Sequence, residues 1–291
     1  MSRNGQKHEH WVPQRPVAVF PLDFAQGAST GWHEHPVHQL VHAATGVMRV
    51  NTRRGSWVVP PRRAVWMPAE VEHEVQMVTS VAMRTVYIVP AALAHAPIRS
   101  CVVPVSPLLA ELILEALRLP RPYPLGGAEE RLFHVLLDRI SFREVLPLEL
   151  ALPTSSPLLG IARRLQLDPA DRRTLEQWAR ASGMSARTLA RGFRCETKLS
   201  FGAWRAQLRL LRALELLAQG TSVTEVALEL GYEGTSAFIS AFRRHLGTTP
   251  AKYFADDAVE PARARSPATS PRPQAARPRR ARPSPSTSRA R

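Results

Sequence analysis

Apolar and polar residues alternate with helical spacing near the end of the chain, over residues 222–254. Four apolar residues lie at i, i+3, i+4 and i+7: Val223, Val226, Ala227 and Leu230. Ser222 and Glu225 have the spacing of a capping box, and Gly231 ends the apolar pattern. A second apolar stripe follows: Phe238, Phe242 and Leu246. Two short helices about a glycine turn are the pattern of a helix-turn-helix.

The same pattern occurs twice, at about 174–195 and 222–245. The first copy contains Thr174, Gln177, Ala179, Gly183, Leu189 and Phe193. The second copy, one residue longer in its second half, contains Ser222, Glu225, Ala227, Gly231, Phe238 and Phe242. Between them a long apolar stripe ends at Gly220: Phe201, Trp204, Leu208, Leu211 and Leu214. This stripe predicts one rigid helix, which would let both modules enter successive major grooves about 34 Å apart.

Strand-like alternation occupies residues 31–89. Segments such as VMRVNT, SWVVP and HEVQMV are rich in Val and broken by Gly and Pro, which predicts many short antiparallel strands. We therefore expect a multidomain α and β protein: an N-terminal antiparallel β-barrel in 1–104, followed by an all-α domain with two helix-turn-helix modules. Residues 1–20 should form a loose arm that leads into the first strand.

The period becomes helical again over residues 105–146. Two stripes carry it: Leu108, Leu109, Leu112 and Ile113, then Leu132, Phe133, Leu136, Leu137 and Ile140. Such helices must bury their stripes either on the barrel or on a second copy of themselves. Residues 147–157 have the composition of a Pro-punctuated linker, and the Arg, Pro and Ser of 255–291 predict a disordered tail.

Charge adds less than the overall balance suggests. The net charge is +15, but nine Arg and no acidic residue fall in 261–291, so most of the excess lies in the tail. That tail is either a non-specific aid to DNA association or an inert extension. The apolar runs are too short to span a bilayer, no signal peptide opens the chain, and Cys101 and Cys195 are expected to be reduced thiols of a cytoplasmic protein.

Residues 158–254 resemble the DNA-binding domain of AraC/XylS-type transcription regulators. The resemblance rests on both modules, on GYEGTSAF and FRRHLGTTP, and on the preceding helix expected at 158–167. It implies a transcription regulator that binds double-stranded promoter or operator DNA. The resemblance also implies a homodimer formed through residues 105–146, and RNA polymerase as a further partner. No membrane contact is expected.

Each recognition helix has an outward face that would meet DNA. In the first, Ser185 is the predicted N-cap, and the outward residues are Arg187, Thr188, Arg191 and Arg194. Matching the family's base-contacting positions also leads to Arg187, Ala190 and Arg191. In the second helix the corresponding residues are Thr235, Ser236, Ser240, Arg243 and Arg244. An Arg can read guanine with two hydrogen bonds or contact phosphate alone, and both readings stay open for Arg187 and Arg191.

Two residues depart from simple helix rules in the first module. Gly192 lies inside the predicted recognition helix, where it costs about 1 kcal/mol relative to Ala. Lys198 stands at the end of that helix, where relatives usually have Gly, so we expect a mildly strained left-handed residue there.

Histidines cluster at the start of the predicted barrel. His33 and His35 in HEHPVHQLVHAATG, followed by Pro68 and His73, resemble the two cupin motifs, in which HxH, a carboxylate and a later His bind a metal. Gln39 stands where cupins have Glu, and Glu70 where they have Gly; a neutral amide is the poorer metal ligand. The candidate pocket comprises Trp32, His33, His35, Gln39, Trp66 and His73. A divalent metal on His33, His35 and His73, a metal-free pocket and a set of buried core histidines all remain open, and His38 and His42 are expected at the surface.

Three functions are compatible with the sequence. The leading one is a ligand-responsive, sequence-specific DNA-binding regulator that is not an enzyme, with a small-molecule effector in the barrel. A cupin enzyme fused to a DNA-binding domain would need a complete metal shell with an open position, against which Gln39 argues. A constitutive DNA-binding protein would follow if core side chains fill the barrel.

Overall fold

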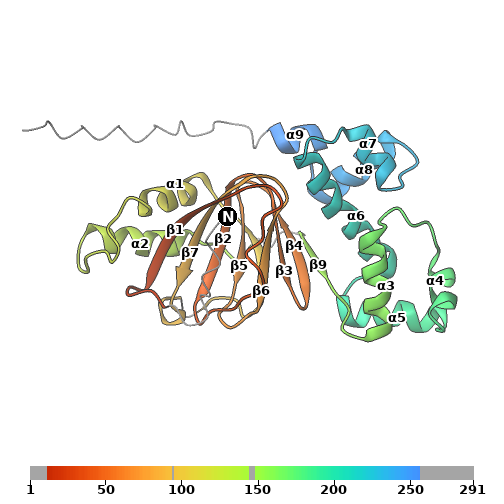
Figure 1. Cartoon of the computed structure of the whole chain (residues 1–291), viewed down its shortest axis with the longest axis horizontal. Coiled ribbons are helices and arrows are strands. Elements are labelled where there is room, and N and C mark those ends of the chain that lie inside the picture. The colour runs from red at the N-terminus through yellow and green to blue at the C-terminus, as the bar shows by residue number, and fades with distance from the viewer. Residues whose placement is uncertain (1–11, 94, 144–147, 256–291) are drawn as a thin grey trace, which may run out of the picture. The chain divides into compact units, whose positions relative to one another are not determined.

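The computed structural model describes residues 12–93, 95–143 and 148–255. Its N-terminal part has two antiparallel sheets (Figure 1). The strands are β1 Val17–Phe24, β2 His38–Thr45, β3 Met48–Thr52, β4 Gly55–Val59, β5 Arg63–Met67, β6 His73–Met77, β7 Val81–Ile88, β8 Cys101–Pro104 and β9 Glu149–Ala151. One sheet has the order β1-β7-β2-β5-β8 and the other β6-β3-β4-β9, so the predicted barrel of short antiparallel strands is confirmed.

Period-2 alternation gives each sheet two different faces. On β3, Met48, Val50 and Thr52 are buried, while Arg49 and Asn51 point the other way and are half-buried. Met48 and Val50 share one apolar cluster with Val41 and other residues of the facing sheet. The strand residues of this cluster form the interior between the two sheets, where four methionines lie: Met48, Met67, Met77 and Met83. The cluster continues into the helical part of the chain.

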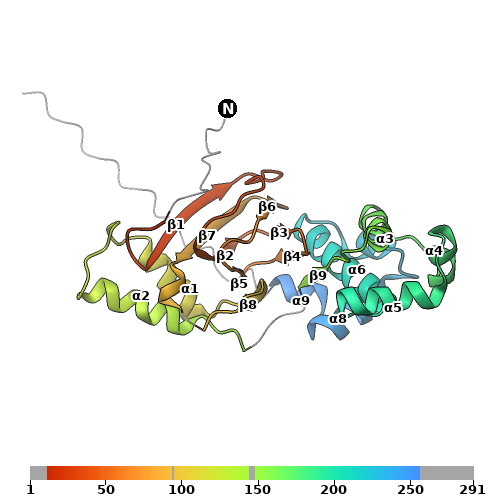
Figure 2. The ribbon, with the colours of Figure 1, turned by 90° about the horizontal axis from the view of Figure 1, so that it is seen from below.

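The helices α1 Pro107–Ala116 and α2 Ala128–Arg139 cover the outer face of the five-stranded sheet (Figures 1 and 2). Their buried residues Leu109, Ile113, Phe133 and Leu136 share a second cluster with strand residues such as Trp66. Each fully buried Leu, Ile or Phe contributes about 1.5–3 kcal/mol. Of the two destinations predicted for these apolar stripes, their own barrel is the observed one.

Part of the predicted linker is a strand. Glu149–Ala151 forms β9, which pairs with β4 through Gly55, Ser56 and Trp57. Leu150 is buried, as expected for the inward position of a three-residue strand. The described part of the predicted linker is therefore not free, because the backbone of residues 148–152 is hydrogen-bonded to the sheet edge.

The C-terminal part is helical. It comprises α3 Ser156–Leu167, α4 Leu175–Ala181, α5 Ala186–Thr197, α6 Phe201–Ala218, α7 Val223–Glu229, α8 Thr235–Leu246 and α9 Pro250–Ala255. Both predicted capping boxes are present, Thr174 with Gln177 and Ser222 with Glu225. The two helix-turn-helix modules and the long helix between them are thus where the periodicity predicts them.

Three special positions in this region have physical explanations. Lys198 is left-handed, with a φ of 64°, as expected. Gly231 has a φ of 71°, and a Cβ there would lie 2.9 Å from the carbonyl oxygen of Ala170, so only glycine fits. Gly192 packs closely against α3, because a Cβ would lie 2.6 Å from Cδ1 of Leu158, which would have to shift.

Other expectations are corrected or lie outside the described residues. His42 is buried, not at the surface, and its Nδ1 lies 2.8 Å from the carbonyl oxygen of Arg63. His38 is half-buried and accepts the backbone N–H of Ala69. The expected arm falls largely, and the expected tail almost entirely, outside the described residues. Among the described helices, none combines the length and apolar character that a membrane crossing needs.

Candidate DNA interface and sensor site

The first recognition helix, α5, separates a buried face from a polar one. Leu189 and Phe193 are fully buried, whereas Arg187, Thr188, Arg191 and Arg194 are exposed and Ala190 is half-buried. Ser185 caps the helix by accepting the N–H of Thr188 at 3.1 Å. Arg187 and Arg191 lie one turn apart on the exposed side, so both guanidinium groups can reach the same DNA groove.

The second recognition helix, α8, has the same division with less charge at its start. Phe238 and Phe242 are buried, and the exposed polar residues are Ser236, Ser240, Arg243 and Arg244. Thr235 is half-buried, and its hydroxyl lies 3.4 Å from that of Thr224 on α7. Arg243 and Arg244 belong to the last turn, where a positive charge is favourable to the helix dipole.

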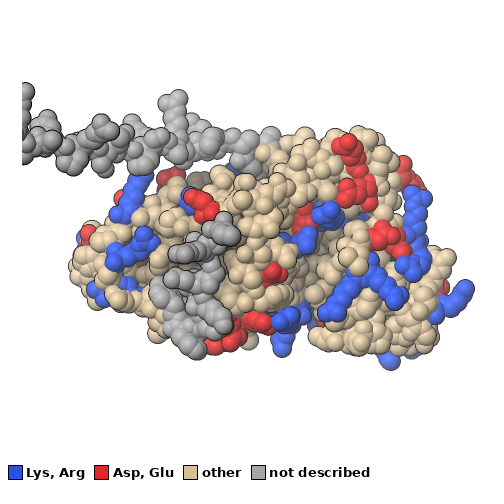
Figure 3. Space-filling model, in the orientation of Figure 1, with Lys and Arg blue, Asp and Glu red and all other residues tan. Residues whose placement is uncertain are grey.

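The helix α6 carries both modules. The ring of Phe193 on α5 lies 5.0 Å from Phe201 and 5.5 Å from Trp204 of α6. At the other end of α6, the second module joins the same apolar cluster through Val226 and Phe238. Figure 3 shows Lys and Arg side chains spread over this helical part, with acidic groups among them. A uniform basic surface is therefore absent from this face, and the placement of particular arginines matters more than total charge.

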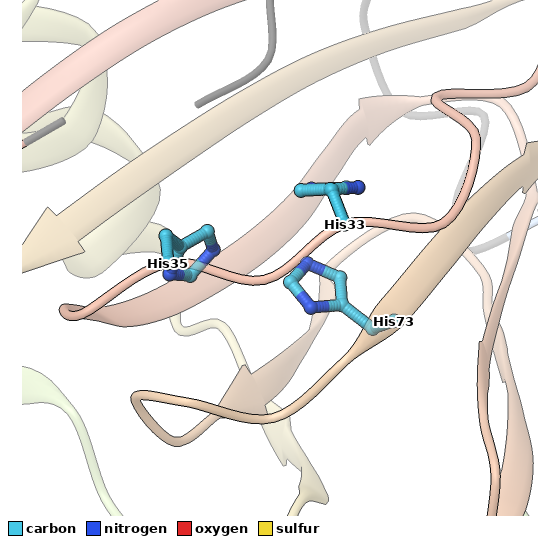
Figure 4. Close-up of side chains that lie close together, drawn as sticks. All are labelled: His33, His35 and His73. Carbon is cyan, nitrogen blue, oxygen red and sulfur yellow. The ribbon is translucent and has the colours of Figure 1, made fainter. Parts of the chain in front are cut away.

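The sensor candidate is a group of three histidines (Figure 4). His33 and His35 precede β2, and His73 begins β6; their ligand atoms all lie within 4.8 Å of one another. The backbones of His33 and His73 pair through two hydrogen bonds of 2.9 and 2.8 Å. This bridge brings together residues that are 40 positions apart in the sequence.

Backbone carbonyls orient all three rings. The Nδ1 atoms of His33, His35 and His73 lie 2.9, 2.8 and 2.8 Å from the carbonyl oxygens of Gly31, Val37 and Val71, respectively. A carbonyl only accepts, so each Nδ1 carries a proton, and in the neutral form of the ring Nε2 presents a lone pair. Three such nitrogen donors are the ligand set of a Zn²⁺-type site with an open fourth position, and carbonyls on Nδ1 are a common outer shell of such sites.

Gln39 bridges two of the three histidines. Its side-chain oxygen is 3.0 Å from Nε2 of His35 and 3.1 Å from Nε2 of His73, and its amide nitrogen donates to Thr85 at 2.7 Å. In this orientation three acceptors face one another, which a cation between them would satisfy. With the amide turned over, its two N–H groups would donate to both histidines without a metal. The residues fit a divalent metal, and they also fit a metal-free hydrogen-bonded network.

Burial favours the neutral form of His73 and His33. It lowers the pKa of His73 to about 3, with a further contribution from nearby His33. Burial also lowers the pKa of His33, opposed by its hydrogen bond to Gly31. Neutral imidazole is the form that either binds a metal or accepts a hydrogen bond.

The two tryptophans predicted for the pocket are not placed alike. Trp32 is 41% exposed, with the guanidinium of Arg53 4.1 Å from its ring centroid. Trp66 points to the opposite face of β5, into the cluster beneath α1 and α2, and its Nε1 donates to Pro97. Assigning Trp66 to the same pocket as the histidines is therefore wrong.

Thr85 and Tyr87 also belong to the site, and the sequence pattern did not predict them. Both belong to β7, where Tyr87 pairs with Gln39 and its ring lies 5.3 Å from that of His35. No local motif marks them, because only the pairing of β2 with β7 brings them close.

Two helix-turn-helix modules on one connecting helix, preceded by a two-sheet domain with a polar buried site, define a DNA-binding protein with a separate sensor domain. Models of an AraC-like ligand binding domain and of a helix-turn-helix domain match residues 23–140 and 178–256, respectively. The HTH-type transcriptional regulator NimR of Escherichia coli (strain K12) is 35% identical over 223 residues, which cover 77% of this chain and 81% of that protein. The chain belongs to the AraC family of helix-turn-helix transcriptional regulators, and it is a DNA-binding transcription regulator with a ligand-binding domain.

Two further similarities concern the C-terminal part. The HTH-type transcriptional regulator RipA of Corynebacterium glutamicum is 42% identical over 102 residues, which cover 35% of this chain and 31% of that protein. Among solved structures, the chain is similar to the crystal structure of the DNA-binding domain of AdpA, the global transcriptional factor, in complex with a target DNA, with 34% sequence identity. The match covers 35% of this chain and 93% of that chain, with a TM-score of 0.34.

Proposed function

We propose that α5 and α8 each read one half of a double-stranded DNA site, with Arg187 and Arg191 supplying most of the base recognition. The supporting observation is that the exposed Arg187 and Arg191 share one side of a helix whose other side is anchored by the buried Leu189 and Phe193. The short hydroxyls of Ser236 and Ser240 discriminate bases less strongly. Arg194, Arg243 and Arg244 would contact phosphates and set the position of the modules on DNA.

Fluorescence anisotropy with a set of related duplexes tests this assignment. Replacement of Arg187 or Arg191 by Ala should reduce discrimination by about 1–3 kcal/mol at the base that the side chain reads. Arg163, which is exposed on α3, provides the matched control, since Arg163→Ala should leave discrimination unchanged. Equal weakening on every duplex would instead assign both arginines to phosphate contacts.

We further propose that His33, His35, His73 and Gln39 form the effector site, and that a divalent metal held by the three Nε2 atoms is part of it. The convergence of three oriented nitrogen donors supports this proposal. The metal would supply a positive charge that attracts a donor atom of the effector. Thr85 would hold Gln39 in place, and Tyr87 and Trp32 would face an incoming molecule.

Elemental analysis and Co²⁺ absorption spectra of the purified protein test the metal. One metal per chain, lost in His35→Ala and retained in the exposed control His134→Ala, is the expected result. Metal-free protein that stays colourless with Co²⁺ would favour the alternative in which the Gln39 amide donates to His35 and His73.

The similar proteins are transcriptional regulators, and we propose that this chain acts in the cytoplasm as one and not as an enzyme. Gln39 stands where cupins have a carboxylate, so the site lacks the carboxylate ligand of a complete cupin metal shell, which supports binding over catalysis. RNA polymerase would then be a partner at the promoter.

We also propose a homodimer through the outer sides of α1 and α2. Leu108 and Val135 are 52% and 43% exposed, although the inner sides of both helices are buried on the barrel. Solution mass measurement should show a dimer for the unmodified protein and a monomer for Leu108→Glu combined with Val135→Glu. A monomeric unmodified protein would contradict the proposal.

A further inference from the structure

A buried carboxylate joins the sensor domain to the helix that carries both DNA-reading modules. Glu215 of α6 is 1% exposed. Arg49 of β3 donates from Nε to one of its oxygens at 2.6 Å and from Nη2 to the other. An ionised carboxylate at this depth requires such partners, and a two-pronged Arg contact also fixes its direction.

The contact continues into the second module. Glu215 also accepts from Arg212 at 3.2 Å, and the other terminal nitrogen of Arg212 lies 3.5 Å from a carboxylate oxygen of Glu229. Glu229 is the last residue of α7, the helix that precedes the recognition helix α8. Arg49, Glu215, Arg212 and Glu229, here called the ion-pair chain, therefore run from β3 through α6 to the second module.

The strand β3 also lies next to the histidine site. It pairs with β6, with Thr52 opposite His73 and Arg49 opposite Gln76. Alternation along β3 directs Val50 and Thr52 inward and Arg49 toward α6. One short strand thus lies between the histidine site and the ion-pair chain.

The ion-pair chain does not act by covering the recognition surface. Arg187 and Arg191 on α5, and Ser240 and Arg244 on α8, are exposed in the same structure in which the ion-pair chain is formed. Its effect must therefore be on the orientation of the second module relative to the first.

We propose that Glu215 is a positioning residue for DNA recognition, through which β3 of the sensor holds the second module in register with the first. A change at β3 would reach α7 through Arg212 and Glu229, and would alter binding at the half site of α8 more than at that of α5. The inference rests on the proposed reading of DNA by both modules.

Hydroxyl-radical footprinting of the full chain separates these roles, on a duplex that the same protein has enriched from a random-sequence pool. Unmodified protein should protect two half sites. Glu215→Gln, which keeps the shape and removes the charge, should weaken protection of one half site at least tenfold and leave the other within twofold. Arg84→Met, which removes the ion pair with Asp23 on another strand, should protect both halves normally.

Equal loss at both half sites in Glu215→Gln, or no loss at either, would overturn the inference. A single protected half site with unmodified protein would overturn the two-module reading itself, and so identifies failure of the proposed function. Glu229→Gln offers a variant at the exposed end of the ion-pair chain, should Glu215→Gln fail to fold. It should weaken the same half site by a smaller factor.

A double-mutant cycle tests the connection itself. Arg49 and Glu229 are linked only through Arg212 and Glu215 in the contacts above, and independent changes would multiply their effects on affinity. If the chain transmits position, Arg49→Met combined with Glu229→Gln should weaken the sensitive half site by clearly less than the product of the two single effects. Multiplicative effects would refute transmission along the chain.

Discussion

A glycine inside the first recognition helix allows the packing between α3 and α5 to be tested. Gly192 is half-buried, and a Cβ there would lie 2.6 Å from Cδ1 of Leu158. Leu158 is itself buried in the shared apolar cluster, at 4% exposure. Gly192→Ala must therefore displace α5 or force Leu158 out of its rotamer.

Two opposing free energies set the size of the effect. Alanine is favoured over glycine inside a helix by about 1 kcal/mol, whereas an extra buried carbon in a packed core costs about 1–3 kcal/mol. Gly192→Ala should thus change the free energy of unfolding by between about zero and −2 kcal/mol. Gly160→Ala on α3, where no atom lies within 4 Å of the new Cβ, should raise it by about 1 kcal/mol.

Urea unfolding followed by tryptophan fluorescence measures both variants. The decisive quantity is the difference between Gly160→Ala and Gly192→Ala, expected at about 1–3 kcal/mol. Adding Gly192→Ala to Leu158→Ala should be stabilising, because the clashing methyl group is then gone. If Gly192→Ala stabilises the unmodified protein as much as Gly160→Ala does, the packing explanation for this glycine is refuted.

Three further outcomes are expected. Burial lowers the pKa of His42 from 6.5 to about 4. The stability contributed by neutral His42 is therefore complete above pH 6.5 and is lost as pH falls toward 4, by about 1.4 kcal/mol per pH unit. In urea titrations, the free energy of unfolding of His42→Phe should fall less steeply with decreasing pH than that of the unmodified protein. Lys198→Gly should raise the melting temperature, because the left-handed conformation costs a non-glycine residue about 1–2 kcal/mol; an unchanged value would contradict this. Gly231→Ala should destabilise by at least about 1 kcal/mol, since it adds that same strain to a close contact with the carbonyl oxygen of Ala170; calorimetry would show a lower melting temperature.

Much of the helical domain could be predicted, because its signals are local. Thr174 with Gln177 and Ser222 with Glu225 begin helices through hydrogen bonds that span three residues. The left-handed conformation of Lys198 follows from its place at a helix end. The period of the apolar residues likewise predicted the barrel strands and the two stripes of 105–146.

The same reasoning failed where a residue's surroundings come from distant segments. The residues 149–151 look like a linker, yet they complete a sheet, because the edge of β4 is free to pair with them. Trp66 and His42 each lie on a strand of the five-stranded sheet. Whether a side chain of that sheet is buried, and against what, depends on the elements that pack on each of its faces.

The sequence by itself determined the elements, their caps and the duplicated DNA-reading module, since each depends on interactions between residues within a few turns of one another. Only the tertiary structure decided which residues meet across the chain. Gln39 reaches Thr85 through the pairing of β2 with β7, and it reaches His73 on the other sheet. Arg49 reaches Glu215, 166 positions away, through the packing of a sheet against a helix. Contacts at such separations depend on where whole elements come to rest, which no local spacing of residues encodes.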